Sequence, residues 1–232
     1  MDAQVWRTAL AEFLGTFLLV FAGPGAIVIN EVSGGQITHI GIGLSFGFAV
    51  MAAIMAFGAI SGAHINPAVS LSFAVNGRLS WSQLPAYVGP QLLGGVAAAA
   101  MLLALFGNVA RLGATTPSGT ELQALAIEAI ISFFLMSVIL SATTDAAAST
   151  ASAAFTIGGY VGLAAIFAGP ITGASMNPAR SLGPSLLSGV WDGHWVYWLG
   201  PIGGALLAGL AFHWLRPSEG ALSPATSGQA AK

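Results

Sequence analysis

The sequence predicts an all-α membrane protein with six transmembrane helices and two re-entrant half-helices in two inverted repeats. Its 232 residues are 56% hydrophobic and only 6% charged, whereas soluble domains carry about 25% charged residues. The apolar segments are unbroken over about 20 residues, the length that a helix needs to cross a bilayer, whereas barrel strands alternate over about 10 residues. The 31 glycines suit closely packed membrane helices, because small residues let backbones approach.

Charge and cysteine content exclude several classes of function. The chain has six Lys and Arg residues, eight Asp and Glu residues and a net charge of −2, so it offers no basic surface for nucleic acid. Because it has no cysteine, it has no disulfide, no thiolate metal site and no cysteine nucleophile. No other nucleophile or cofactor motif is present. We therefore expect neither an enzyme nor a bound metal or cofactor.

The six expected spans are 10–29, 40–60, 84–106, 122–140, 152–169 and 195–215. The first is too long, and preceded by too few cations, for a cleaved signal peptide. An even number of spans places both termini on one side of the membrane. That side would hold four cations, Arg7, Arg78, Arg216 and Lys232. The opposite loops hold only Arg111, so the positive-inside rule predicts cytoplasmic termini, in the inner (plasma) membrane.

Two further apolar segments are too short to span the membrane. Segments 65–75 and 176–187 hold 11 and 12 residues, which makes about 15–18 Å of helix, half a bilayer. Both contain Asn-Pro-Ala near the start, as Asn66, Pro67 and Ala68 and as Asn177, Pro178 and Ala179. Asn is a strong N-cap and Pro suits the first helical position, so each triplet predicts the start of a half-helix. A surface turn explains one Asn-Pro but not two copies with matching flanks.

The two triplets belong to an internal repeat. At one constant offset along the chain the following pairs are identical: Gly62/Gly173, Ala63/Ala174, Asn66/Asn177, Pro67/Pro178, Ala68/Ala179, Ser70/Ser181 and Leu71/Leu182. Each half would then have three spans, an odd number, so the second half must enter the membrane inverted. We expect one transmembrane domain over 1–216, built from repeats at about 5–106 and 120–216, and a flexible tail over 217–232.

These features resemble the major intrinsic protein family, the aquaporins and aquaglyceroporins. The resemblance rests on the paired Asn-Pro-Ala triplets, on Arg180 after the second triplet, and on Glu12 and Glu128 at matching places in spans one and four. The segments AEFLGTFLLVFAGPGA and TGASMNPARSLGP also resemble the nodulin-26-like and related bacterial branch. The resemblance implies a homotetramer in the lipid bilayer, with one pore per subunit.

Two helix starts that meet at the membrane midplane would form an electrostatic barrier. Helix N-termini carry unpaired N–H groups and partial positive charge, which repel cations. If Asn66 and Asn177 cap their helices through oxygen, each NH₂ group is left free to donate into the lumen. A water molecule that accepts both donors would point its hydrogens away from the centre, which breaks a proton wire. The alternative is that both asparagines are purely structural caps.

Arg180 is the only cation within an apolar segment, and an intramembrane charge is by default a functional hypothesis. The alternative is an arginine that snorkels to the outer interface. By resemblance Arg180 belongs to the outer selectivity filter, whose other members fall at Phe46, Ala165 and Ala174. Water-selective members typically have His and Thr or Cys at the two alanine positions. The resemblance therefore implies a wide, less polar filter. In contrast, Tyr197 and Trp198 at the start of the sixth span resemble water-channel members more than glycerol facilitators.

Glu12 and Glu128 are carboxylates within predicted spans and allow two interpretations. By resemblance each accepts hydrogen bonds from backbone N–H groups of a re-entrant loop, which need partners at membrane depth. Alternatively they relay protons in a coupled transporter. His64 beside the first triplet is expected to stabilise its loop, since no ligand cluster surrounds it.

The resemblance and the motifs together predict a passive channel for water and small uncharged solutes. A wide filter would admit glycerol or metalloid hydroxides such as arsenous, boric or silicic acid. A strict water channel is the first alternative, and a secondary active transporter built on inverted repeats is a more distant one.

Overall fold

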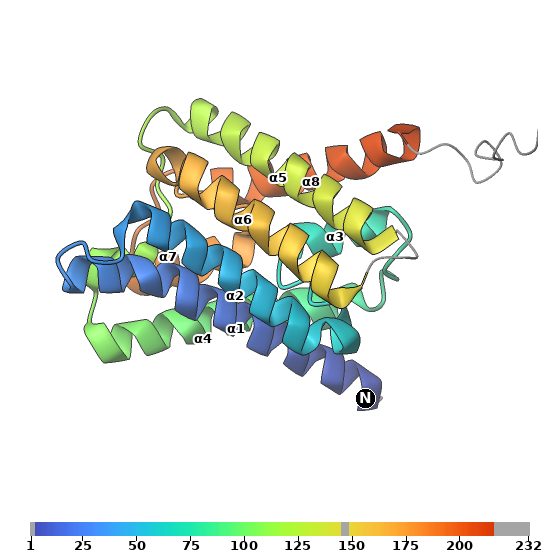
Figure 1. Cartoon of the computed structure of the whole chain (residues 1–232), viewed down its shortest axis with the longest axis horizontal. Helices are drawn as coiled ribbons and strands as arrows, with labels where there is room; N and C mark the ends of the chain where they lie inside the picture. Colours follow the sequence, from blue (N-terminus) through green and yellow to red (C-terminus); the bar gives the residue numbers. More distant parts are fainter. Residues whose placement is uncertain (1–2, 145–148, 216–232) are drawn as a thin grey trace, which may run out of the picture.

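The computed structural model describes residues 3–144 and 149–215 (Figure 1). Its six long helices are α1 (Ala3–Val32), α2 (Thr38–Ser61), α4 (Leu84–Phe106), α5 (Glu121–Thr144), α6 (Thr150–Thr172) and α8 (Val196–Leu215). The shorter ones are α3 (Pro67–Val75), α7 (Pro178–Ser188) and the 3-10 helix η1 (Val109–Gly113). All six long helices are long and apolar enough to cross a membrane, and they match the six predicted spans. The predicted tail over 217–232 lies outside the described residues, as do Arg216 and Lys232.

Helix α1 is longer than the predicted span 10–29. It has 30 residues, which corresponds to about 45 Å of helix, whereas the hydrocarbon core of a bilayer is about 30 Å thick. The prediction counted only the uninterrupted apolar residues. The helix continues beyond them at both ends, where Gln4 and Glu31 remain in helical backbone.

Both half-helices begin at the proline of their Asn-Pro-Ala triplet, two residues later than the predicted segments begin. Ile65 and Met176 have φ angles of 45° and 52°, a left-handed conformation that an α-helix does not contain. Asn66 and Asn177 follow in extended backbone with φ of −155° and −153°. The chain therefore turns sharply before each helix start.

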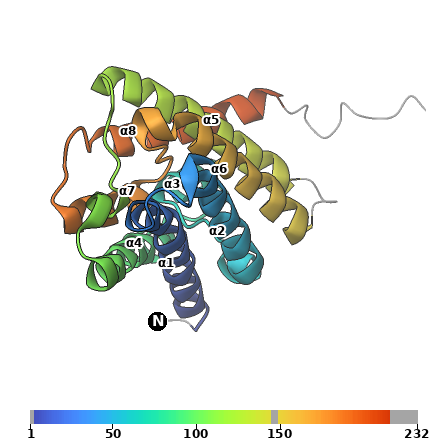
Figure 2. The ribbon, with the colours of Figure 1, turned by 60° about the vertical axis from the view of Figure 1, so that its left-hand side comes forward.

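The half-helices α3 and α7 both pack against α4 and α8, with α3 toward one end of the bundle and α7 toward the other (Figures 1 and 2). Helix α1 packs on α4 within the first half, α5 packs on α8 within the second, and α2 packs on α6 between the halves. The N-terminal end of α1 and the C-terminal end of α5 lie at the same end of the bundle (Figure 1). The equivalent helices of the two halves therefore run in opposite directions, as the inverted repeat predicts.

Glycines allow the paired helices to touch through their backbones. A Cβ added at Gly94 on α4 would lie 2.4 Å from the carbonyl oxygen of Phe13 on α1. A Cβ added at Gly204 on α8 would lie 2.1 Å from the carbonyl oxygen of Ala129 on α5. The two glycines occupy nearly equivalent places in the repeat, so both halves use glycine at the same contact. The prediction that glycine serves close helix packing is confirmed at these sites.

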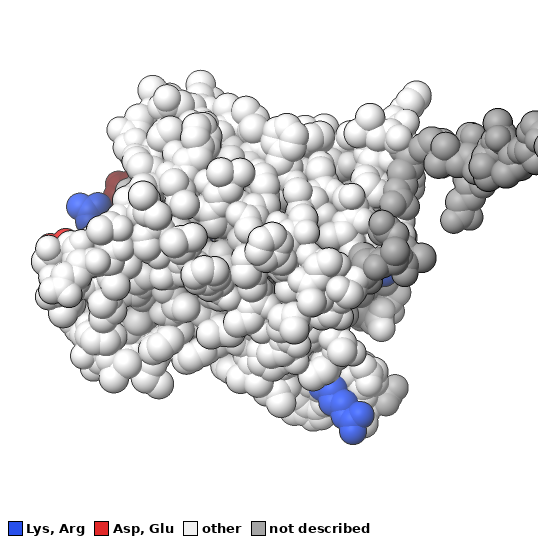
Figure 3. Space-filling model, in the orientation of Figure 1, with Lys and Arg blue, Asp and Glu red and all other residues white. Residues whose placement is uncertain are grey.

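The outer surface is suited to lipid. Large apolar side chains are exposed on several long helices, among them Phe155, Leu163 and Leu207. On the face drawn in Figure 3 the charged side chains lie at opposite ends of the bundle, and a broad uncharged band separates them. A chain with six apolar helices and such a surface crosses the membrane several times.

Candidate pore

Each asparagine of the two triplets caps the half-helix that follows it. The N–H of Ala68 donates to Asn66 Oδ1 at 2.9 Å. The N–H groups of Ala179 and Arg180 donate to Asn177 Oδ1 at 2.9 and 3.3 Å. An Asn oxygen that accepts from the first turn satisfies backbone donors that have no partner within the helix. The predicted caps are therefore present in both halves.

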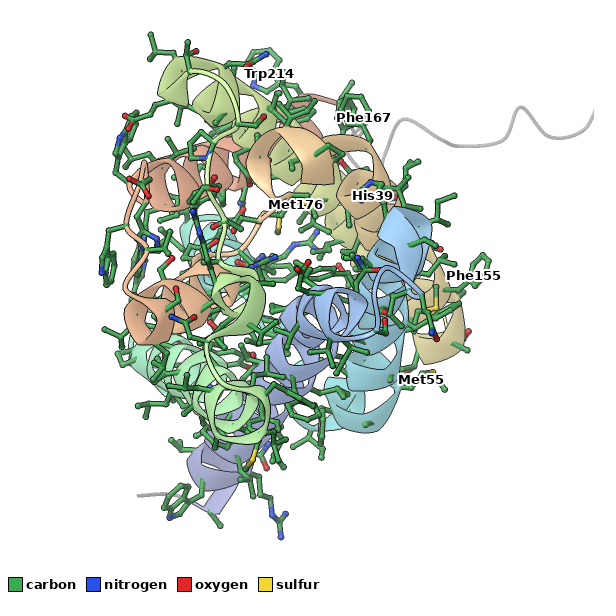
Figure 4. All side chains as sticks on the ribbon, turned by 90° about the vertical axis from the view of Figure 1, so that its left-hand side faces the viewer. His39, Met55, Phe155, Phe167, Met176 and Trp214 are labelled. Carbon is green, nitrogen blue, oxygen red and sulfur yellow. The ribbon has the colours of Figure 1, made fainter. Side chains whose placement is uncertain are left out.

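The amino groups of the same asparagines tie the two halves together. Asn66 Nδ2 donates to the carbonyl oxygen of Met176 at 2.7 Å, and Asn177 Nδ2 donates to that of Ile65 at 2.8 Å. The expectation that each NH₂ group is wholly free for the lumen is thus wrong, because one of its two hydrogens bonds to the opposite loop. Each triplet is a local signal in the sequence, so this exchange between the two loops was not predictable from either triplet alone. Met176 lies near the centre of the bundle in the end-on view (Figure 4).

Glu12 holds the first re-entrant loop. Its Oε1 accepts from the Ser61 hydroxyl at 2.6 Å and the His64 N–H at 2.9 Å. Its Oε2 accepts from the Ile65 N–H at 2.7 Å and from Gln91 Nε2 at 2.8 Å. The carboxylate is fully buried, and its donors come from the end of α2, from the loop and from α4. The predicted loop-anchoring bonds are present.

Glu128 holds the second loop in the same way. Its Oε1 accepts from the Thr172 hydroxyl at 2.7 Å and the Ser175 N–H at 2.8 Å, and its Oε2 accepts from the Met176 N–H at 2.8 Å. Glu12 and Glu128 are both absent from the cavity lining. Their geometry is that of buried acceptors for re-entrant backbone, which has no water to bond at membrane depth.

Several supporting contacts were not predicted from the sequence. Gln91 donates to Ser70 Oγ at 2.9 Å as well as to Glu12. Tyr87 and Tyr197 donate their hydroxyls to the carbonyl oxygens of Ser61 and Thr172, each at 2.8 Å. The tyrosines occupy nearly equivalent places in the two halves, so the repeat was the signal that could have revealed them.

His64 is built into the first loop. Its Nδ1 lies 3.1 Å from Ser70 Oγ, and its ring packs against the rings of Phe73 and Tyr87, with centroids 4.7 and 4.6 Å away. Among the described residues no group of three His, Cys, Asp or Glu side chains could hold a metal ion. The contacts of His64 are those of a residue that stabilises its loop.

A cavity of about 370 Å³ extends along the bundle and joins these elements. Arg78, Thr143 and Thr150 line one end, and Phe46 and Arg180 line the other. Between the ends, one wall is made by the two re-entrant loops and both asparagines. The opposite wall is apolar, with Val50, Ile54, Leu135, Ile139, Ile157 and Val161. The loops therefore supply the polar groups of the cavity between its two ends.

The end of the cavity beside Arg180 holds three of the four residues that resemblance assigns to a filter. Arg180 Nη1 donates to the carbonyl oxygen of Gly113 at 2.8 Å, and its Cζ lies 4.9 Å from the centroid of the Phe46 ring. Arg180 is buried, and its Nε and Nη2 have no hydrogen-bond partner among the described residues. Ala174 lines the cavity here, whereas Ala165 does not. Ala165 is one helical turn beyond Val161, which does line it.

His39 lies beside the same region of α6. Pro170 within α6 has no N–H, so the carbonyl of Ile166, four residues earlier, loses its helical donor. His39 Nε2 lies 2.6 Å from this carbonyl oxygen and is placed to donate to it. His39 extends from α2 toward α6 (Figure 4). Its position near a span end gave no reason to single it out in the sequence.

Comparisons with known proteins agree with this geometry. A family model described as "Major intrinsic protein" matches residues 1–212. Aquaporin NIP1-3 of Oryza sativa subsp. japonica is 44% identical over 216 residues, which cover 93% of this chain and 76% of that protein. Nodulin-26 of Glycine max is 43% identical over 218 residues, which cover 94% of this chain and 80% of that protein.

A solved structure shares the same arrangement. The X-ray structure of the aquaglyceroporin from Plasmodium falciparum matches with a TM-score of 0.85 and 25% sequence identity, covering 91% of this chain and 96% of that chain. The family model spans most of this chain, and the two plant relatives match it over most of their own length. This chain belongs to the major intrinsic protein family.

Proposed function

We propose that this chain is a passive membrane channel for water and small uncharged solutes. The observation that carries the proposal is the meeting of two capped helix starts in the wall of one cavity. Asn66 and Asn177 each donate a hydrogen bond to a backbone carbonyl of the opposite re-entrant loop. The similar proteins agree with it, since they are named as aquaporins and an aquaglyceroporin.

The charges around the cavity favour neutral permeants. The N-termini of α3 and α7 carry partial positive charge toward its middle. Arg78 and Arg180 are near its two ends, and no carboxylate is among its described lining residues. A cation therefore meets repulsion along the whole path. Each asparagine NH₂ group retains one hydrogen that can donate to a passing oxygen.

The groups at the Arg180 end suit solutes larger than water. Ala174 contributes only a methyl group, and Phe46 offers an apolar face to a carbon skeleton. Arg180 Nε and Nη2 are buried donors without a partner among the described residues, and a hydroxyl that accepts from them offsets the cost of leaving them unpaired. We propose that glycerol and metalloid hydroxides pass with water. A strict water channel remains the alternative.

The carboxylates give little support to a secondary active transporter. Glu12 and Glu128 accept four and three hydrogen bonds from neighbouring groups. Neither lines the cavity, so neither is placed to exchange a proton with a permeant. We propose that both are loop anchors and that the chain catalyses no reaction.

We further propose a homotetramer in the plasma membrane with cytoplasmic termini. The cation distribution supports this orientation, because Arg7 lies near the start of α1 and Arg78 follows α3, whereas Arg111 lies in the loop at the other end. Light scattering of the detergent-solubilised protein measures the number of subunits in the oligomer. Protease access to the C-terminal segment in sealed vesicles of known sidedness measures the orientation.

The channel proposal is tested by stopped-flow light scattering of liposomes that contain the purified protein. Water efflux is measured in an impermeant osmolyte gradient, and solute entry is measured in glycerol and boric acid gradients. Protein-free liposomes are the control. We expect rapid water flow and solute entry that persist when ionophores collapse every ion gradient. Transport that stops with the ion gradient would instead support a coupled carrier.

A further inference from the structure

Gly23 on α1 lies directly behind the aromatic ring of the candidate filter. A Cβ added at Gly23 would be 2.3, 2.5 and 2.8 Å from Cε1, Cδ1 and Cζ of Phe46. All three distances are shorter than those that real Cβ atoms adopt. The ring of Phe46 on α2 therefore rests against the backbone of α1, and only glycine leaves it this space.

The same ring also meets the guanidinium of Arg180. The Cζ of Arg180 lies 4.9 Å from the Phe46 ring centroid, a separation typical of a cation–π contact. Phe46 is thus held between the backbone of α1 and the filter arginine. A change that displaces the ring from α1 drives it toward Arg180 and the cavity.

A second contact returns from Arg180 to the neighbouring residue of α1. Arg180 Nη1 donates to the carbonyl oxygen of Gly113 at the end of η1. Gly113 has φ of +69°, and a Cβ there would be 2.9 Å from Cα of Pro24. The step from Gly23 to Pro24 therefore supports the ring on one side and the loop that holds the arginine on the other.

We propose that Gly23 is a specificity-determining residue of this channel, which sets the aperture between Phe46 and Arg180 from outside the pore. The inference rests on the proposed channel function. It adds a position on α1 that touches no permeant, so Gly23 is a positioning residue for the filter side chains. It also gives a physical reason for the Gly23-Pro24 step in the first span, which does not itself line the pore.

The size of the effect follows from the contact distances. Ordinary carbon–carbon contacts are about 3.5–4.0 Å, so a methyl group at Gly23, 2.3 Å from Cε1 of Phe46, requires this ring atom to move by about 1.2–1.7 Å. The open space beside the ring is the cavity that it lines. The filter then narrows, and a solute that fits closely loses more flux than water. A difference of one methylene in a fitted pocket changes discrimination by about 10-fold or more.

The experiment compares Gly23→Ala with Gly25→Ala in proteoliposomes. Gly25 lies on the same helix, but a Cβ there would meet Leu102 Cδ2 at 3.2 Å, at the flexible end of a side chain. We expect Gly23→Ala to lower the ratio of glycerol to water permeability by about 10-fold and Gly25→Ala to leave it unchanged. The double variant with Gly23→Ala and Phe46→Leu should have the same ratio of glycerol to water permeability as Phe46→Leu alone, because the smaller leucine side chain leaves room for the added methyl group.

The outcomes separate this inference from the proposed solute range. If the wild type excludes glycerol, the wide filter is wrong, and the same comparison is made with water permeability, which Gly23→Ala should lower and Gly25→Ala should not. A folded Gly23→Ala with unchanged water and glycerol flux overturns the inference. If Gly23→Ala does not fold, the double variant with Phe46→Leu should. Failure of the double variant, when Phe46→Leu alone folds, would place the conflict elsewhere and also overturn the inference.

Discussion

Replacing Glu128 by alanine should abolish folding of the second re-entrant loop. Three donors, the Thr172 hydroxyl and the N–H groups of Ser175 and Met176, converge on the Glu128 carboxylate at 2.7–2.8 Å. A buried donor that loses its partner costs about 1–3 kcal/mol, so the loss of all three costs about 3–9 kcal/mol. Folded proteins are stable by only about 5–15 kcal/mol. We therefore expect little folded Glu128→Ala protein.

Glu128→Gln separates the anchoring role from proton transfer. The amide keeps one oxygen, which can still accept from Thr172 and Ser175, but its NH₂ group then faces the Met176 N–H. One bond is lost, at a cost of about 1–3 kcal/mol. We expect a folded, less stable channel with most of its water permeability, since the side chain at this position does not line the cavity.

Thermal unfolding in detergent and water efflux from liposomes measure the two effects together. Glu31→Gln, at an exposed carboxylate near the end of α1, is the matched control and should change neither. A Glu128→Ala protein as stable as wild type would refute the anchoring argument. A stable Glu128→Gln protein that has lost all transport would instead indicate a proton relay.

Three further sets of substitutions test the pore. Asn66→Leu or Asn177→Leu removes a helix cap worth about 1 kcal/mol and a hydrogen bond between the loops, so permeation or folding should be lost. If both single variants fold and conduct like the wild type, the midplane arrangement is wrong. Arg180→Val should raise proton or cation leak in liposomes while water flow persists, and an unchanged leak would assign ion exclusion to the central helix starts alone. Ala174→Thr enlarges a residue of the cavity lining, and Ala165→His places a longer side chain one helical turn from Val161, which also lines it. The double variant should therefore sharply reduce glycerol or metalloid entry and leave substantial water flow; a wild type that already excludes every larger solute would instead be a strict water channel.

The sequence was sufficient for the features that depend on one segment at a time. Apolar length predicted the six spans, and Asn66-Pro67 and Asn177-Pro178 predicted both half-helix starts. The repeat offset predicted the inversion. These properties follow from hydrophobicity, from capping and from the odd number of spans in each half.

Contacts between distant segments were less accessible to sequence reasoning. The amino group of Asn66 bonds to Met176, in the other half of the chain, and Arg180 bonds to Gly113, in the loop between the halves. Every residue has a backbone carbonyl, so the residue types in the sequence do not indicate which carbonyl accepts a given hydrogen bond. Gly23 was equally hidden, since its role is the space that it leaves for Phe46. Resemblance assigned Ala165 to the filter, and that role stays a prediction, whereas the cavity lining of this part of α6 includes Val161, one helical turn earlier.

A comparison of the two repeats explains why a buried arginine follows the second Asn-Pro-Ala triplet but not the first. Val69 and Arg180 occupy equivalent places after the two triplets, and both are buried. Burying a guanidinium is expensive unless it is paired or hydrogen-bonded. Arg180 has the Gly113 carbonyl and the Phe46 ring face. In the repeat Phe46 corresponds to Ile157, which offers a cation no ring face, and η1 lies between the halves, where a single copy serves only the second. The buried arginine of the filter therefore depends on α2 and the connecting loop, which place its ring and carbonyl partners at one end of the cavity only.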